Sequence, residues 1–200
     1  MIATMFLVVV VVVVVVSRLL LPGFSSRKLL NRDQIVQALT RLGELANAEG
    51  HTLTLVVVGG SALILRYNAR ESTQDVDVFM GTPPERRATR RWAGIVAKEL
   101  GIPADWLNDG AKGFMNVVSY GQVILEAPGI IVHQASSEQL LAMKLSAWRD
   151  QQDANDAAVV LRDLIQTYGS KELLWNAITP YVNDMKAQYA FEELWEELHG

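Results

Sequence analysis

The chain has 200 residues and contains no cysteine. This absence excludes disulfide bonds, thiolate metal sites and cysteine nucleophiles, and it fits a reducing compartment. Histidine is scarce as well, because only His51, His133 and His199 occur, and they lack the spacing of metal ligands. The formal net charge of −4 argues against a protein that coats nucleic acid. Any contact with nucleic acid would have to be local.

Hydrophobic residues, by contrast, make up 50% of the chain, enough to bury one good core with a small second lobe. This composition is typical of a folded globular protein and not of a disordered one. The chain shows no internal repeat. The Pro-Gly-Phe-Ser-Ser stretch at residues 22–26 is a cluster of helix breakers and marks the expected boundary between an N-terminal segment and the fold.

The N-terminal segment is a long apolar run. Residues 2–16 are apolar except for Thr4, and as a helix they would reach about 22 Å, short of the ~30 Å hydrocarbon core. Extending the helix to Leu21 gives enough length but places Arg18 inside the membrane. Two interpretations stay open: an anchor, or a low-complexity extension from a misassigned start. We expect a cytoplasmic protein, attached to the inner membrane only if residues 2–21 are an anchor, because basic residues follow that run.

Hydrophobic periodicity, β-branched runs and turn residues predict the order of the elements. In the first half we expect a helix capped by Asn31 and ending at Gly50, a strand at 52–58, a short helix at 61–67, a strand at 75–80 and a helix at 82–100. In the second half we expect a helical turn within 103–109, a hairpin of 116–119 and 122–126 about Tyr120–Gly121, a short strand at 130–133, and helices at 140–149, 153–168, after Ser170 and at 182–198.

Together these elements predict an α/β (α+β) fold, in which helices flank a small mixed β-sheet and a helical lobe follows. We expect residues 1–26 to stand outside the fold, residues 27–135 to form the core, and residues 136–200 to form the helical lobe packed on it. Ser136 and Gln139 have the spacing of a capping box for the first helix of that lobe. Asp153 is placed to cap the next helix.

A glycine pair ends the first predicted strand. Gly59 and Gly60 follow three valines and precede Ser61 and a short helix. Glycines let the backbone turn sharply and approach a ligand closely, and the start of a helix presents free N–H groups that suit a phosphate. Taken alone, a strand followed by two glycines and a helix is more often just a tight turn.

The second predicted strand carries two carboxylates, Asp75 and Asp77. Residues two apart in a strand point to the same face, so the two side chains would project together. Adjacent carboxylates repel each other unless a cation joins them, and Mg²⁺ that also binds phosphates is such a cation. A lone Asp-x-Asp is more often a solvated strand edge. The glycine pair and the two carboxylates together indicate a phosphate and metal site far more specifically than either motif alone.

The combined pattern resembles the nucleotidyltransferase superfamily that includes DNA polymerase β. It is carried by Gly59-Gly60-Ser61-Ala62-Leu63 and by Arg70-x-x-Thr73-x-Asp75-Val76-Asp77-Val78. Three later segments strengthen it: Asp105-Trp106-Leu107-Asn108-Asp109, Lys144-Leu145-x-Ala147-x-Arg149 and Asp153-x-x-Asp156. Within the superfamily, the chain looks closest to small bacterial nucleotidyltransferase-like proteins related to abortive-infection toxins. The resemblance covers roughly residues 33–165.

The resemblance implies a role for each matching residue. The glycine pair and Ser61 would cradle the triphosphate, and Asp75 and Asp77 would hold Mg²⁺. Arg70 and Thr73 would shape the loop between the two motifs, with Arg70 near phosphate. From the helical lobe, Lys144 would neutralise phosphate charge, and Asp153 and Asp156 would orient Lys144 or Arg149, or touch the metal site.

Active members of the superfamily often carry a third carboxylate that serves as general base. Glu126 is the best candidate in this chain, although it precedes Ala127-Pro128-Gly129 and would equally fit a solvated strand end. Arg86, Arg87, Arg90 and Arg91 form a basic stripe at helical spacing, which is either a solvated face or a binding surface for an acceptor.

The expected function is Mg²⁺-dependent transfer of a nucleoside monophosphate from a nucleoside triphosphate to an RNA, such as tRNA, or to a protein. A role in a toxin–antitoxin system with an antitoxin-like partner fits the resemblance. The alternative is a non-catalytic nucleotide-binding or interaction module on the same fold, which the uncertain third carboxylate favours.

Overall fold

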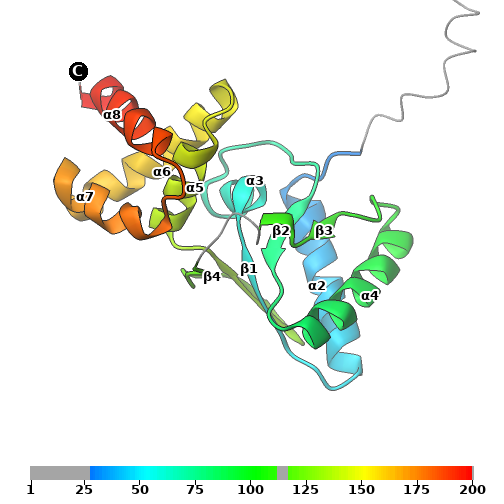
Figure 1. Ribbon diagram of the computed structural model, residues 1–200. Helices are drawn as coiled ribbons and strands as arrows, with labels where there is room; N and C mark the ends of the chain where they lie inside the picture. Colours follow the sequence, from blue (N-terminus) through cyan, green and yellow to red (C-terminus); the bar gives the residue numbers. More distant parts are fainter. Residues whose placement is uncertain (1–27, 112–116, 200) are drawn as a thin grey trace, which may run out of the picture.

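A computed structural model describes residues 28–111 and 117–199 of the chain (Figure 1). Within them, seven α-helices and a five-stranded mixed sheet make up the α+β fold that the sequence predicts. The first half contains α2 (Arg32–Ala48), β1 (Leu53–Val57), α3 (Gly59–Ala62), the π-helical turn η1 (Leu63–Tyr67), β2 (Val76–Phe79), α4 (Pro83–Leu100) and β3 (Leu107–Asn108). The second half contains β4 (Val123–Ala127), β5 (Ile130–Gln134), α5 (Ser137–Ala147), α6 (Gln151–Tyr168), α7 (Lys171–Ile178), the 3₁₀ turn η3 (Thr179–Tyr181) and α8 (Lys186–His199).

The sheet has the strand order β3-β2-β1-β5-β4. At its centre, β1 runs parallel to β5, with Leu55 opposite Val132, and antiparallel to β2, with Val57 opposite Val78. The central strand is buried on both faces, which explains its unbroken run of β-branched and aliphatic residues. In β2, Val76 and Val78 are fully buried while the residues between and after them are half-buried, so the strand has one apolar face.

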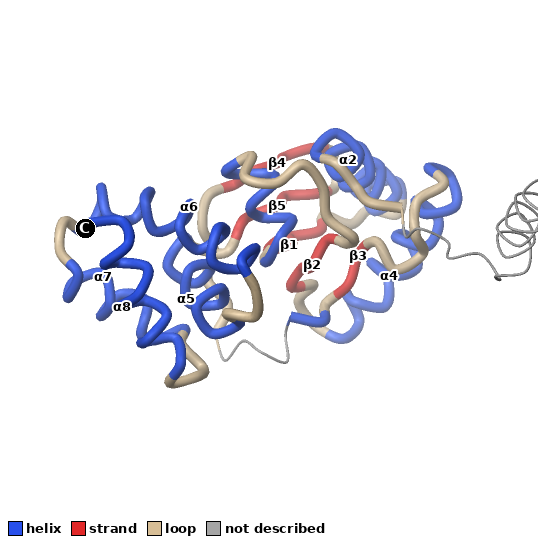
Figure 2. Tube along the Cα trace, turned by 90° about the horizontal axis from the view of Figure 1, so that it is seen from above, coloured by secondary structure: helices blue, strands red, loops and turns tan. Residues whose placement is uncertain are grey.

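Two long helices, α2 and α4, pack against each other, and α2 also lies on β4 and β5 (Figure 2). The apolar positions predicted for α2 form its buried stripe, and Asn31 caps the helix as predicted, with its side chain accepting from the Gln34 N–H. Gly43 allows the close approach to the sheet, because a Cβ at this position would clash with Ile130. These contacts join the two helices and the sheet in one apolar core.

Helices α5 to α8 form the second part of the molecule, beside the sheet (Figures 1 and 2). Helix α5 is central to it, since it packs against α6, α7 and α8 and also touches α3. Phe191 of α8 is buried between two indoles, with ring-centroid distances of 5.2 Å to Trp175 and 5.8 Å to Trp195. Across residues 28–111 and 117–199, no helix has both the length and the apolar character required to span a membrane. The predicted anchor at residues 2–21 lies outside the described residues.

The structure corrects the predicted hairpin. The turn lies at Pro128–Gly129, between β4 and β5, and not at Tyr120–Gly121. Gly129 has a φ of +73°, which suits glycine, whereas Gly121 is held in line with β5 by donating its N–H to the Gln134 carbonyl. Residues 117–119 form no strand, and Asn116 lies outside the described residues.

The segment predicted as a helical turn and loop contains the short strand β3 instead. Val76 donates its N–H to the Trp106 carbonyl, and Asp77 pairs with Asn108. The buried Trp106 indole, which donates to the Ala93 carbonyl at 3.0 Å, holds this segment against α4 and beside β2. A two-residue strand leaves no periodicity in the sequence, so only this non-local pairing defines it.

Three predictions for the helical part also need correction. The Gln139 side chain does not close a capping box, because its Oε1 accepts from Ser119, although Ser136 does accept from the Gln139 N–H. The cap of α6 is Asp150, and Asp153 lies in the first turn of that helix. The last helix begins at Lys186, since residues 179–181 form a 3₁₀ turn.

Candidate active site

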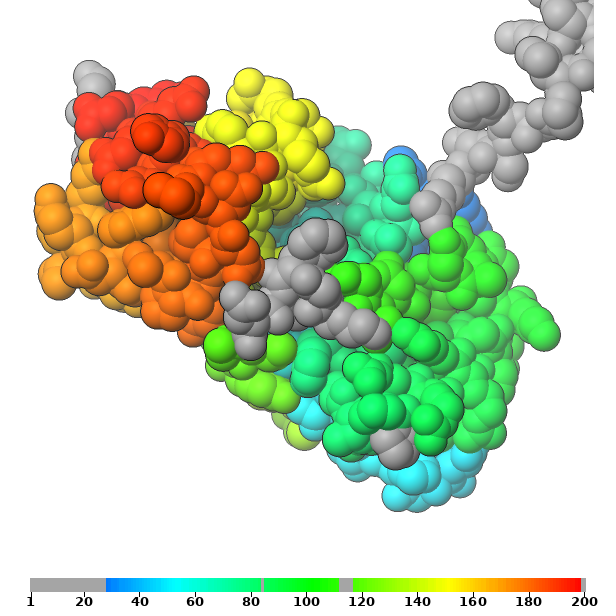
Figure 3. Space-filling view, viewed as in Figure 1, coloured from blue at the N-terminus to red at the C-terminus, as the bar shows by residue number. Residues whose placement is uncertain are grey.

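A cleft of about 1060 Å³ lies between the sheet and the helical part of the molecule. The two parts lie side by side in Figure 3, and the surface is hollowed where they meet. The cleft is lined from the β1–α3 turn, the loop before β2, β2 itself, the end of α5 and the turn before α8; the lining residues used below are Gly59, Gly60, Arg70, Thr73, Asp75, Asp77, Lys144, Ser146, Arg149, Asn183, Asp184 and Lys186.

The glycine pair makes room for its neighbours. Gly59 has a φ of +61°, and a Cβ there would lie 3.4 Å from the Asp77 Oδ2 atom. A Cβ on Gly60 would lie 3.0 Å from Nη1 of Arg70 and 3.4 Å from Oγ1 of Thr73. The two glycines therefore open one wall of the cleft at the point where Asp77, Arg70 and Thr73 converge.

Ser61 is not brought into the cleft. Its side chain is buried, and its hydroxyl donates to the Val58 carbonyl at 3.0 Å. A serine near the start of a short helix can bond to the preceding turn in this way, and sequence does not reveal which direction its hydroxyl takes. Thr73 does line the cleft, and its backbone exchanges two hydrogen bonds with Leu30, which fixes the loop before β2.

The two carboxylates of the Asp-x-Asp pair both face the cleft. Asp75 lies directly before β2 and accepts from Nδ2 of Asn108 at 3.0 Å. The orientation of that amide is fixed, because its Oδ1 accepts from the Gly110 N–H at 2.8 Å. Burial raises the pKa of Asp77 to about 6, and the negative charge of Asp75 acts in the same direction. The pair is thus a place where negative charge is poorly compensated.

From Arg70 beside Gly60 to the helical part of the molecule, five charged side chains form a continuous cluster, which we call the ion cluster: Arg70, Lys144, Arg149, Asp153 and Asp156. Nζ of Lys144 lies 2.9 Å from Oδ1 of Asp153 and 2.8 Å from Oδ2 of Asp156. Nε of Arg70 donates to Asp156 at 2.9 Å, and Nε of Arg149 donates to Asp153 at 2.9 Å. Three cations against two carboxylates leave one net positive charge on the side of the cleft that faces Asp75 and Asp77.

Both aspartates of the ion cluster are almost completely buried, each with 1% of its surface exposed. Burial alone would raise the pKa of Asp153, yet the hydrogen bonds from Arg149 and Lys144 outweigh it and hold the pKa well below its usual value. The same balance, with Arg70 and Lys144 as donors, lowers the pKa of Asp156. Both groups are therefore charged at neutral pH, and their role is to hold the cations in place.

The chain reaches this geometry through an unusual turn at the end of α5. Trp148 adopts a left-handed conformation with a φ of +35°, which is uncommon for a bulky residue. The turn brings the backbone N–H of Arg149 to Oδ2 of Asp153 at 3.2 Å, and Lys186 donates to the nearby Ala147 carbonyl at 3.1 Å. The end of α5 is thus fixed from both α6 and α8.

Glu126 lies elsewhere. It is exposed on β4, the edge strand farthest from β2 and β3, and it pairs with Ile131. It does not line the cleft that holds Asp75 and Asp77. The basic stripe of α4 is partly neutralised, because Arg90 pairs with Asp109 and Arg91 with Glu49.

Sequence reasoning assigned no role to Asn108, which positions Asp75, or to Asn183, Asp184 and Lys186, which complete the cleft. Asn108 lies in the 105–109 segment that contributes to the family resemblance, so a role for this residue could have been predicted from the sequence. The other three lie before and at the start of α8, and nothing local in the sequence predicts that this turn folds back onto the cleft.

The fold, the glycine turn and the paired carboxylates define a nucleotidyltransferase-like protein. Comparison with family models agrees: residues 33–197 match a family described as nucleotidyltransferase of unknown function (DUF6036). Because the match covers most of the chain, the protein belongs to this family. Comparisons with curated proteins and with solved structures give no match. The nucleotidyltransferase resemblance is thereby confirmed, and the link to abortive-infection toxins stays a prediction.

Proposed function

We propose that the protein transfers a nucleoside monophosphate from a nucleoside triphosphate to an acceptor hydroxyl, with Mg²⁺ as cofactor. The observation that carries this proposal is the arrangement of the cleft, in which two carboxylates face a cluster with a net positive charge. A nucleoside triphosphate with its metal ion has the complementary pattern, because a cation adjoins several negatively charged oxygens.

The residues fit a magnesium ion. Asp75 and Asp77 offer hard oxygen ligands. Burial and the negative charge of Asp75 raise the pKa of Asp77, and a bound cation would oppose both effects. Among the described residues, no group of three or more histidine, aspartate or glutamate side chains could hold a metal ion. Phosphate and water oxygens would therefore complete the coordination, as is usual for Mg²⁺ at phosphate-transfer sites. When bound, the ion would neutralise charge that develops on the reacting phosphate.

The side chains of the cleft supply binding and orientation. Gly59 and Gly60 leave space for the triphosphate beside Asp77, and the cations of the ion cluster meet its negative charge. Arg149 is the most accessible of these cations, with 73% of its side chain exposed, while Lys144 and Arg70 act from the wall. In the reaction, the acceptor hydroxyl loses its proton to solvent and its oxygen bonds to the α-phosphorus. The bond between the α-phosphorus and the oxygen that bridges to the β-phosphate breaks, and pyrophosphate leaves.

A transfer assay tests the proposal. The full chain is incubated with each α-labelled nucleoside triphosphate, Mg²⁺, and either total tRNA or cell protein as acceptor. We expect label on one acceptor class, and we expect it to vanish with Asp75→Asn/Asp77→Asn and with a chelator. Glu126→Gln serves as the matched control, because this carboxylate is exposed and lies outside the cleft. Label that survives loss of both aspartates would sink the proposal.

The absence of Glu126 from the cleft favours a second candidate function, a nucleotide-binding module without transfer activity. In that case the chain would bind nucleoside triphosphate with Mg²⁺, dependent on Asp75 and Asp77, but no acceptor would be labelled. An antitoxin-like partner protein fits either candidate. Adding the products of neighbouring genes to the same assay tests whether a partner activates or blocks the site.

A further inference from the structure

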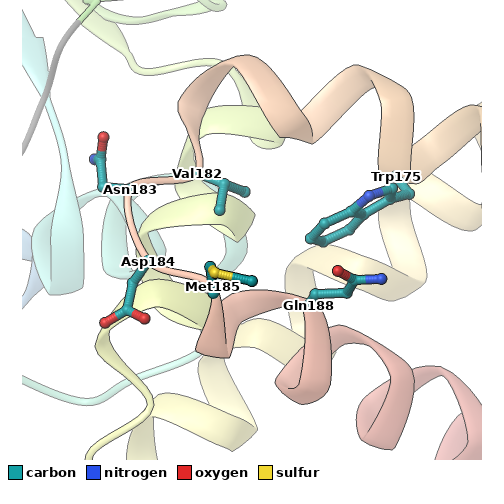
Figure 4. Close-up of a pocket in the computed structure, with 6 residues that line it drawn as sticks. All are labelled: Trp175, Val182, Asn183, Asp184, Met185 and Gln188. Atoms are coloured by element: carbon teal, nitrogen blue, oxygen red, sulfur yellow. The ribbon is translucent and has the colours of Figure 1, made fainter.

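We propose that a second, smaller pocket beside the cleft binds a nucleobase. This inference rests on the function proposed above and deepens it. The pocket has a volume of about 320 Å³ and lies between the end of α7 and the start of α8. Its side chains come from Trp175, Val182, Asn183, Asp184, Met185 and Gln188 (Figure 4).

The turn before α8 has two faces. Val182, Met185 and Gln188 point toward the indole of Trp175, whereas Asn183 and Asp184 point away from it (Figure 4). Those last two residues also line the large cleft, together with Lys186. A ligand that occupies the cleft therefore needs to cross only this turn to reach Trp175.

The small pocket offers what a flat heteroaromatic ring requires. The Trp175 indole packs against the buried ring of Phe191, at a centroid distance of 5.2 Å. Met185 has 84% of its surface exposed, so a large apolar side chain stands open to solvent opposite the indole. An aromatic ring and a thioether together form an apolar slot, and stacking on aromatic side chains is a general way to hold a base.

Polar groups at the edge of the slot fit a base better than a purely apolar ligand. Gln188 offers an amide, which can donate and accept at once, the pattern that base edges require. The adjoining cleft carries the cations of the ion cluster, which suit phosphate, whereas Lys186 is paired with Asp184 at 3.8 Å. A nucleotide thus finds its phosphate partners on one side of the turn and its base partners on the other. The base belongs either to the nucleoside triphosphate or to an RNA acceptor.

Binding measurements on the full chain distinguish these sources. The probes are the four nucleoside triphosphates, inorganic tripolyphosphate and a short single-stranded oligoribonucleotide, each titrated calorimetrically with Mg²⁺. For Trp175→Ala we expect a loss of roughly 5- to 150-fold in affinity for a base-containing probe, the range that follows from alanine substitution at stacked bases, and no change for tripolyphosphate. A loss for a triphosphate assigns the pocket to the donor nucleotide. A loss for the oligoribonucleotide alone assigns it to the acceptor.

Further variants keep the test independent of folding. Trp175→Phe retains a ring and should recover most of the affinity. Met185→Ser and Gln188→Ala alter exposed side chains and should weaken the same probe. Leu173→Ala and Tyr189→Ala change exposed residues outside the pocket and should have no effect. Unchanged affinity of the Met185, Gln188 and Trp175 variants for every base-containing probe overturns the inference but leaves the proposed function standing. Failure of the unmutated chain to bind any probe overturns both.

Discussion

Replacing Asp77 by asparagine should stabilise the metal-free protein at neutral pH. Burial and the Asp75 charge raise the pKa of Asp77 from 3.8 to about 6, so the charged form is disfavoured in the folded state. Each pKa unit corresponds to about 1.4 kcal/mol, which sets a ceiling of about 3 kcal/mol. Asp77 is only half-buried, so screening by solvent should reduce the gain to about 1–2 kcal/mol.

The sign of this effect depends on pH. Below the unfolded pKa near 4, Asp77 is protonated in both folded and unfolded chains and costs nothing. Above about pH 4 the unfolded chain loses the carboxyl proton of Asp77, whereas the folded chain keeps it until about pH 6. The stability of the wild type therefore falls as the pH rises through this range. The substituted asparagine side chain would carry no charge at any pH. The stability difference should therefore be small at pH 4 and complete above pH 7.

Urea denaturation followed by circular dichroism measures the difference, at pH 7.5 and pH 4, with chelator and with excess Mg²⁺. Magnesium should stabilise the wild type and not Asp77→Asn, because a ligand that binds only the folded state adds to its stability. Glu126→Gln is the matched control and should behave like wild type throughout. If Asp77→Asn is no more stable than wild type at pH 7.5 without metal, the two carboxylates do not share one buried site, and the case for a metal pair fails.

The contacts around the cleft also determine the outcome of three further substitutions. Gly59→Ala should lower stability by about 1 kcal/mol because of its positive φ, and circular dichroism melts should show it together with weaker binding of tripolyphosphate. Ser61→Ala should cost about 1 kcal/mol of stability through the lost bond to Val58, yet leave the affinity for nucleoside triphosphate unchanged; a large loss of affinity would show that the hydroxyl reaches phosphate. Lys144→Met should cost about 3 kcal/mol by urea denaturation, since Asp153 and Asp156 lose a buried partner, and the loss should shrink at low pH as these carboxylates protonate. An equal loss of stability at neutral and at low pH would contradict that account of Lys144→Met.

Local signals predicted the framework of the fold. The α2 helix was predictable because its cap and its apolar stripe lie within one segment. Strand β1 was predictable because it consists of aliphatic and β-branched residues, all of them buried except Thr54. β3 was not predictable, since two residues carry no periodicity and only their pairing with β2 defines them. The hairpin was misplaced because both candidate turns contain glycine, and the pairing with β5, not the local sequence, decides between them.

The candidate site shows the same division. Sequence placed Asp75 and Asp77 together because their spacing along one strand is enough. The association of Lys144 with Asp153 came from the family resemblance, and the structure shows the two side chains hydrogen-bonded. The bond between Arg70 and Asp156 joins positions 86 residues apart, and no local rule predicts it. The same holds for the turn before α8, which closes the cleft from the far end of the chain.

The two sides of the cleft therefore depend on different contacts: one forms within the core, and the other requires the helical part of the molecule. The predictable residues, Gly59, Gly60, Asp75 and Asp77, come from consecutive elements of the core and form one wall. The ion cluster that faces them exists only when the helical part is folded onto that core, because Arg70 belongs to the core and its partner Asp156 to α6. Because Asp156 binds both Arg70 and Lys144, Asp156→Asn would loosen two cations of the ion cluster while leaving Asp75 and Asp77 in place. Binding of tripolyphosphate should then weaken, and the metal-dependent stabilisation through Asp77 should persist.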